Sequence, residues 1–259
     1  MILRIHDQPQ DSNNMATAKI FIPPPTAVES PVFHDAVTLT NGVGPSADLP
    51  QQRQPRTIAE LIDIRAEELP SQPIVSYPFS GVEYVDYTYF DLQRYSKNAS
   101  GSLASHMTLR QASTEPEMVV AILGPSDFDY LINALALSRL GCTVLFLSTR
   151  ISDAAYSSLL TATNCSNIIY YPKFSETIET LKKSIPTLSA IERLTNQQYS
   201  ESTAYVANPL DLAVENGKIS WVIHSSGSTG MPKPIYQTHN AALRKYVYPQ
   251  PIYVRKQAL

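Results

Sequence analysis

Residues 219–239, ISWVIHSSGSTGMPKPIYQTH, join an apolar strand directly to a cluster of small hydroxyl and glycine residues. Residues 219–223 have the apolar pattern of a buried strand, and the turn pair Asn216-Gly217 precedes them. Small residues, two of them glycines that can adopt positive φ, can turn several backbone N–H groups toward one centre. The sequence therefore predicts an anion-binding loop at the end of this strand. The loop consists of Ser225, Ser226, Gly227, Ser228, Thr229 and Gly230.

A phosphate group is the ligand that suits this loop best, because N–H and O–H donors bind a charged acceptor more strongly than a neutral one. Lys233 follows the loop and adds a positive charge that can reach the same anion. Pro232 and Pro234 favour extended geometry for the residues before them. Residues 233–237 are therefore expected to form a second strand, which gives the order strand, loop, strand.

Two other interpretations of the loop are disfavoured by its surroundings. A P-loop NTPase requires G-x-x-x-x-G-K-[ST] at the start of a helix. Here Lys233 lies three residues after Gly230, and Pro234 follows it in place of Ser or Thr. A flexible Gly/Ser linker between domains is the second possibility, but this run is short and lies between a Trp-containing strand and a Pro-Lys-Pro segment.

The segment HSSGSTGMPKPIYQTH closely resembles the phosphate-binding signature of the AMP-forming superfamily of acyl- and aminoacyl-adenylate enzymes (AMP-dependent synthetase/ligase). The usual form of that signature is S-G-[ST]-T-G-x-P-K. The flanking His-Ser-Ser and Lys-Pro-Ile resemble fungal nonribosomal-peptide-synthetase-like and carboxylate-reductase-type adenylation domains. By this resemblance, residues 225–230 would wrap the β- and γ-phosphates of ATP, and Lys233 would assist. These are binding roles, and no residue is assigned a catalytic one.

The chain upstream of the loop begins with a helix and a hairpin. Thr57-Ile58-Ala59-Glu60 is expected to be a capping box that opens a helix, and Pro70 is expected to end it. Residues 73–77 and 82–89 predict a hairpin, after which Thr88 is expected to cap a helix to about residue 103. This order is similar to the start of an adenylation domain.

Strands and helices then alternate. The apolar run 118–123 predicts a central parallel strand buried on both faces. Ser126 and Asp129 are expected to form a start like a capping box for the next helix, and Gly141 is expected to end it. Asp127 and Asp129 are themselves expected to be capping groups. Further strands are expected at 142–147 and 168–171, and further helices at 152–163 and 176–183 and from Thr238 onward.

This alternation predicts an α/β fold: the amino-terminal portion of an adenylation-domain fold, with a doubly wound, mostly parallel sheet and flanking helices. Ligands of such sheets bind outside the carboxyl ends of the strands. The loop 225–230 follows a strand at that kind of position.

Three regions are expected along the chain. Residues 1–54 are rich in proline and poor in periodic apolar positions, so little stable structure is expected there. Residues 55–248 are expected to form an incomplete adenylation domain, and residues 249–259 a tail. The family that the chain resembles also uses later segments that bind adenine, magnesium and ribose, and a mobile subdomain with a catalytic lysine. Their motifs are not found in these 259 residues, so we expect a truncated domain that is inactive alone.

In that family, a carboxylate attacks the α-phosphate of ATP, pyrophosphate leaves, and the acyl group passes to a thiol. The resemblance implies ATP with Mg²⁺ as cofactor, and a carboxylic acid and a phosphopantetheinyl carrier domain as partners. Two alternatives stay open. One is a non-catalytic remnant that binds nucleotide, pyrophosphate or another protein; the other is a chain that does not fold stably, because a shortened sheet exposes an apolar face and an unpaired edge.

Composition and residue spacing bear on other binding partners, on metal sites, on localisation and on the histidines. A net charge of −3 and a pI near 6.0 give no electrostatic case for nucleic acid or an anionic membrane. Cys142 and Cys165 lie far apart without a Cys-x-x-Cys pattern, so no metal site is expected. No signal-peptide pattern or bilayer-length apolar run is found, which favours the cytoplasm. His224 and His239 flank the loop without a partner at catalytic spacing, so we expect the first to pack or hydrogen-bond at a strand end and the second to help start the next helix.

Overall fold

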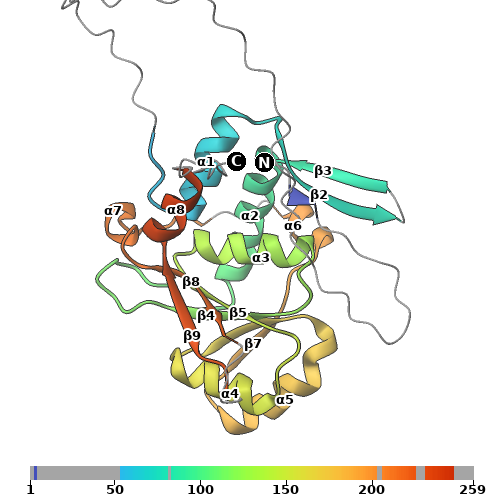
Figure 1. The fold of residues 1–259 in the computed structure, drawn as a ribbon, viewed down its shortest axis with the longest axis vertical. Coiled ribbons are helices and arrows are strands. Elements are labelled where there is room, and N and C mark those ends of the chain that lie inside the picture. Colours follow the sequence, from blue (N-terminus) through green and yellow to red (C-terminus); the bar gives the residue numbers. More distant parts are fainter. Residues whose placement is uncertain (1–2, 5–52, 81–82, 203–205, 226–230, 248–259) are drawn as a thin grey trace, which may run out of the picture.

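The computed structural model describes residues 3–4, 53–80, 83–202, 206–225 and 231–247, which form a six-stranded sheet with helices on both faces and a smaller three-stranded sheet (Figure 1). The strands are β1 (Leu3–Arg4), β2 (Pro73–Ser80), β3 (Glu83–Thr88), β4 (Val119–Leu123), β5 (Thr143–Leu147), β6 (Asn167–Tyr170), β7 (Ser189–Glu192), β8 (Ile219–His224) and β9 (Pro234–Thr238). The helices are α1 (Ile58–Glu68), α2 (Tyr89–Ala104), α3 (Phe128–Arg139), α4 (Asp153–Ala162), the short 3₁₀ helix η1 (Pro172–Phe174), α5 (Ser175–Ser184), α6 (Asn196–Glu201), α7 (Leu212–Glu215) and α8 (His239–Val247).

The large sheet has the strand order β7-β6-β4-β5-β8-β9. All its pairings are parallel except that of β8 with β9. After β5 the chain crosses β4 to reach β6 and later returns to place β8 beside β5, so the sheet is doubly wound. The predicted central parallel strand is confirmed as β4, and the second strand of the loop motif is confirmed as β9.

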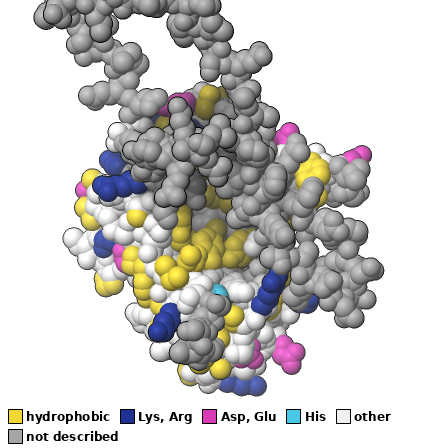
Figure 2. All heavy atoms as spheres, viewed as in Figure 1, with side chains coloured by type: hydrophobic (Ala, Val, Ile, Leu, Met, Phe, Trp, Pro, Cys, Tyr) yellow, Lys and Arg dark blue, Asp and Glu magenta, His cyan; other side chains and the backbone are white. Residues whose placement is uncertain are grey.

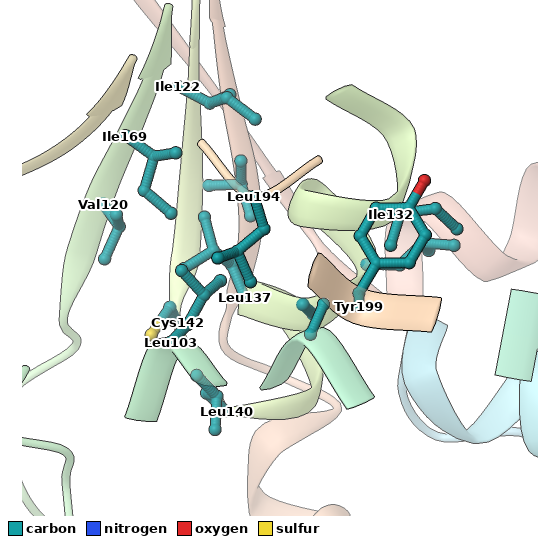
Figure 3. Packing of buried hydrophobic residues seen from close by; sticks show 14 of the residues in the cluster. Leu103, Val120, Ile122, Ile132, Leu137, Leu140, Cys142, Ile169, Leu194 and Tyr199 are labelled. Atoms are coloured by element: carbon teal, nitrogen blue, oxygen red, sulfur yellow. The ribbon is translucent and has the colours of Figure 1, made fainter. Parts of the chain in front are cut away.

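Two apolar layers hold this sheet between helices. Alternate residues of β4 point to opposite faces, so Val120 and Ile122 join the layer under α2 and α3, whereas Ala121 and Leu123 join the layer over α4 and α5. Figure 3 shows the first layer, in which the labelled strand residues lie on the side of the sheet that faces Leu137 of α3. Both faces of the sheet are therefore covered along β4, as its continuous apolar sequence predicted.

The three-stranded sheet packs against the start of α3. The ring of Tyr87 on β3 stacks on Phe128 with the ring centroids 3.7 Å apart. The predicted hairpin is confirmed, with β2 extending to Ser80. Leu3 and Arg4 add a parallel strand to β2, although little stable structure was expected in residues 1–54. Residues 1–2 and 5–52 lie outside the described residues.

Two helix starts differ from the predicted capping. Thr57 accepts from the backbone N–H of Glu60, as expected, but the Glu60 carboxylate accepts from the N–H of Arg56 and not from Thr57. The start of α3 is capped by Asp127, which accepts from the N–H of Tyr130 at 2.9 Å. The expectation that Asp127 is a capping group is therefore confirmed, whereas the capping box that begins at Ser126 was wrong. The Asp127 carboxylate also accepts hydrogen bonds from the guanidinium of Arg193.

Gly141 ends α3 as predicted, in the left-handed region with φ of 71°. A β-carbon at this position would lie 2.2 Å from Cδ1 of Leu210 and 3.3 Å from a guanidinium nitrogen of Arg110. The positive φ therefore favours glycine here, and a β-carbon would also force the buried Leu210 side chain to shift.

We expect Gly141→Ala to lower the free energy of unfolding by about 1–3 kcal/mol, since it combines positive-φ strain with a steric overlap. Gly217→Ala is a matched control because its β-carbon would meet only ordinary contact, with Val214 O at 3.8 Å. We expect that variant to stay within about 0.5 kcal/mol of the wild type. Equilibrium urea unfolding of both variants measures the difference, and equal losses would contradict this role for Gly141.

Candidate functional site

The candidate site lies at the carboxyl edge of the large sheet, where β5 and β8 end side by side. The β4–β5 ladder is paired along its whole length, up to Leu123 opposite Leu147. The β5–β8 ladder pairs only Val144 with Trp221 and Leu145 with Val222. Main-chain pairing between β5 and β8 thus stops two residues before either strand ends. An edge of this kind in a doubly wound sheet is where ligands bind.

The ends of the predicted phosphate loop are fastened to each other. The N–H of Ser225 donates to the carbonyl of Lys233 at 3.0 Å, and the N–H of Lys233 donates to Oγ of Ser225 at 3.3 Å. This pair continues the β8–β9 register, in which His224 lies opposite Pro234. The Ser225 hydroxyl still has its own hydrogen to donate, and the Lys233 side chain is exposed. The structure thus brings together the first and last of the predicted site residues.

The other predicted site residues, Ser226, Gly227, Ser228, Thr229 and Gly230, lie outside the described residues. Their contribution to phosphate binding stays a prediction. The hydrogen-bonded pair of Ser225 and Lys233 limits where such a loop can begin and end.

His224 forms hydrogen bonds at the end of β8, as expected. Its Nε2 accepts from the backbone N–H of Ser148, the residue after β5, at 3.1 Å. Its Nδ1 lies 3.4 Å from the carbonyl oxygen of Ser225. The carbonyl of Ser148 in turn accepts from the hydroxyl of Tyr156 at 2.9 Å. Sequence spacing gave no sign of the Ser148 contact, because it depends on β8 lying next to β5.

His239 has a different role from the one expected. It is the first residue of α8, but its Nδ1 accepts from the backbone N–H of Ile58 at 3.2 Å, so it satisfies a free amide at the start of α1. The start of α8 is instead stabilised by Thr238, whose Oγ1 accepts from the N–H of Ala241. Burial lowers the pKa of His239 to about 4, against an opposing effect of Glu215.

A second polar cluster supports the same edge of the sheet near β7. The guanidinium of Arg193 donates to both carboxylate oxygens of Asp127 at 2.6 Å and lies over the ring of Tyr171, 4.5 Å from its centroid. The hydroxyl of Tyr199 donates to Asp129, and burial raises the pKa of that carboxyl group. Because these groups are engaged with one another, we interpret the cluster as structural support for the turn between β4 and α3.

A cavity in the described part of the chain lies at the opposite, amino edge of the sheet. It has a volume of about 440 Å³ and is lined by residues from α1, α2 and α3, together with Gly141, Glu215 and His239. Charged groups that line it are already paired, as in the ion pair of Arg139 with Asp63 at 2.9 Å. Neither Ser225 nor Lys233 lines this cavity, and parallel sheets bind ligands at the other edge.

The described part of the chain contains neither a cluster of metal ligands nor a membrane-spanning helix. No group of three His, Cys, Asp or Glu residues within it is placed to hold a metal ion. None of its helices combines the length and apolar character needed to cross a bilayer.

A protein-family model and several curated proteins match this chain. The family model described as AMP-binding enzyme matches residues 62–256. An adenylate-forming reductase of Aspergillus terreus is 34% identical over 134 residues, which are 48% of this chain and 12% of that protein. A carboxylic acid reductase of Neurospora crassa is 30% identical over 200 residues, which are 71% of this chain and 18% of that protein. This chain therefore spans less than a fifth of the length of these two curated relatives.

Solved structures show the same fold at low sequence identity. An anthranilate CoA ligase in complex with anthranoyl-AMP matches with a TM-score of 0.58 and 16% identity, over 74% of this chain and 35% of that one. A fatty acyl-adenylate ligase from L. pneumophila, in complex with acyl adenylate and pyrophosphate, matches with a TM-score of 0.52 and 15% identity, over 72% of this chain and 31% of that one. The predicted α/β fold is thus confirmed.

His239 predicts a specific pH dependence of stability. Its pKa is about 4 in the folded chain, against an ordinary value of 6.5. The stabilisation from the neutral ring is therefore complete above pH 6.5 and is lost as the pH falls toward 4. His239→Asn keeps an acceptor for the N–H of Ile58 but does not titrate. Between pH 7 and pH 4.5, urea unfolding should show that the wild type loses about 2 kcal/mol more than this variant. Equal losses in the two proteins would contradict a buried neutral His239.

Proposed function

The chain belongs to the AMP-binding enzyme family, and from this premise we propose that residues 225–233 bind the polyphosphate of ATP. The observation that carries the proposal is the hydrogen-bonded pair of Ser225 and Lys233 at the carboxyl end of β8. It places a hydroxyl donor and a lysine at the two ends of a loop made of small residues. The domain to which this loop contributes would activate a carboxylic acid as an acyl-adenylate.

Each group in the loop has a binding role. Backbone N–H groups and the hydroxyls of Ser225 and Thr229 would donate to phosphate oxygens, while the Lys233 ammonium would offset their negative charge. The carboxylate oxygen of the acid would then bond to the α-phosphorus as the bond to the leaving pyrophosphate breaks. Such chemistry depends on positioning and charge neutralisation, so loss of one well-aimed donor is expected to cost about 3 kcal/mol of transition-state stabilisation.

Magnesium would enter with the nucleotide and neutralise phosphate charge. Of the residues that we propose to bind phosphate, none carries a carboxylate, and the described part of the chain offers no three-ligand cluster. The residues of the loop therefore fit a Mg²⁺ ion that would be held mainly by the phosphates and by water, which is a common arrangement for Mg²⁺.

We also propose that residues 55–248 are the amino-terminal portion of the adenylation domain, and that acyl-adenylate formation needs the later family segments as well. The exposed apolar surface at β8 and β9 supports the proposal that these residues are only a portion of the domain. Ile223 and Ile235 lie opposite each other across the two strands, and each is 46% exposed. Figure 2 shows hydrophobic side chains gathered in the middle of one face of the molecule. A carboxylic acid and a phosphopantetheinyl carrier domain are the partners that we propose for the complete enzyme.

Isothermal titration of pyrophosphate or ATP into the 259-residue protein tests the binding role. We expect the wild type to bind, Lys233→Ala to bind about tenfold more weakly because one charge-assisted contact is lost, and Gly227→Val to lose binding. Lys183→Ala is the matched control, since it removes an exposed lysine in the last turn of α5. Equal affinities for the Lys233 and Lys183 variants would contradict the proposed site.

An ATP–pyrophosphate exchange assay tests the proposal that acyl-adenylate formation needs the later family segments as well. We expect no exchange by the 259-residue polypeptide with a panel of aromatic and aliphatic acids, even where the titration shows binding. Exchange above the level of the Gly227→Val variant would show that these residues suffice for catalysis and would overturn this part of the proposal.

A further inference from the structure

We propose that His224 is a positioning residue for the phosphate loop: its imidazole fixes the carboxyl end of β8 against β5 and so sets the direction in which Ser225 starts the loop. This inference rests on the proposed phosphate-binding function of residues 225–233. It assigns to the histidine a role in ligand affinity that goes beyond packing at a strand end.

The first observation is that main-chain pairing does not hold the end of β8 to β5. The register between these strands stops at Leu145 opposite Val222, although β8 continues to His224. The bond from the Ser148 N–H to Nε2 of His224, 3.1 Å long, spans the strands just beyond this point. The His224 side chain thus connects β8 to β5 beyond the end of their main-chain ladder, one residue before the loop begins.

The second observation is the protonation state that this bond requires. Nε2 accepts a hydrogen bond, so it carries no proton, and the neutral ring has its proton on Nδ1. Nδ1 lies 3.4 Å from the carbonyl oxygen of Ser225 and can donate to it. One ring therefore contacts the main chain at the end of β5 and at the start of the loop. Phenylalanine can fill the same space but can make neither contact.

The third observation is that Ser148 is itself held from the core. Its carbonyl accepts from the hydroxyl of Tyr156 at 2.9 Å, and Tyr156 on α4 is only 2% exposed. Hydrogen bonds thus run from Tyr156 through Ser148 and His224 to Ser225, which is paired with Lys233. A buried side chain under the sheet is in this way connected to both ends of the loop.

The experiment compares His224→Phe with His224→Gln, using pyrophosphate as the ligand in calorimetric titrations. Glutamine can present Oε1 to the Ser148 N–H, so we expect its affinity to stay within about threefold of the wild type. We expect phenylalanine to weaken binding about tenfold, which corresponds to the loss of about 1.4 kcal/mol. Thermal unfolding of the same samples must show a cooperative transition.

Tyr156→Phe supplies a second and independent test. It removes the hydroxyl that holds Ser148 but leaves the residues of the loop unchanged. If His224 acts through Ser148, the substitution should weaken pyrophosphate binding in the wild type and have no further effect in the His224→Phe background. If His224→Phe does not fold, the glutamine variant and Tyr156→Phe in the wild-type background still test the inference, because wild-type affinity in Tyr156→Phe would contradict it.

Three outcomes would overturn the inference while the proposed function stands: wild-type affinity in His224→Phe, failure of His224→Gln to retain binding although it is folded, or equal effects of Tyr156→Phe in both backgrounds. Absence of pyrophosphate binding in the wild type itself is a different result. It would overturn the proposed function and, with it, the role of His224.

Discussion

The pairing of Ser225 with Lys233 is the constraint on which the candidate site depends. β8 and β9 are antiparallel neighbours in a sheet that is otherwise parallel, so the segment between them must leave and re-enter the sheet at the carboxyl edge. The two hydrogen bonds between Ser225 and Lys233 fix the points at which it does so. A loop made of small residues and held at both ends is suited to converging its amides on one anion.

The rest of the fold holds this edge in place. Apolar layers cover both faces of β4 and β5, and buried ion pairs connect segments that are distant in sequence. Arg193 holds Asp127 at the carboxyl edge, whereas Arg110 holds Glu215, which precedes β8, at 2.7 Å. Breaking one partner of such a pair leaves an uncompensated buried charge, so these contacts restrict how the strands that carry the site can move.

Much of this fold follows from local sequence patterns. Continuous apolar runs predicted β4, β5, β6 and β8 because each is buried in the large sheet, and Gly141 predicted the end of α3 because the chain needs positive φ there. β7, α6 and α7 were missed, since they are only four to six residues long and lack a full period of apolar residues. Asp127 was predicted as a capping group, but its second contact, with Arg193 66 residues away, could not be predicted from local sequence.

The candidate site was also predictable in part, because some of its features depend only on local sequence. The composition of residues 225–230 and the prolines around Lys233 indicated a strand, a loop and a second strand, which needs only local information. The contact between His224 and Ser148 depends on strand order, which local patterns do not determine. The ion pairs of Arg193 and Arg110 join residues 66 and 105 positions apart, so no spacing rule could have identified them.

The most direct test of the account is a two-dimensional ¹H–¹⁵N NMR titration of the 259-residue protein with pyrophosphate, with amides assigned around the loop and around the cavity at the amino edge. The account predicts saturable shifts of the amides of residues 225–230 and Lys233, together with Ser148, and unchanged amides at Gly141 and Glu215. Shifts confined to the amino edge, or no saturable shift in the loop, would contradict it.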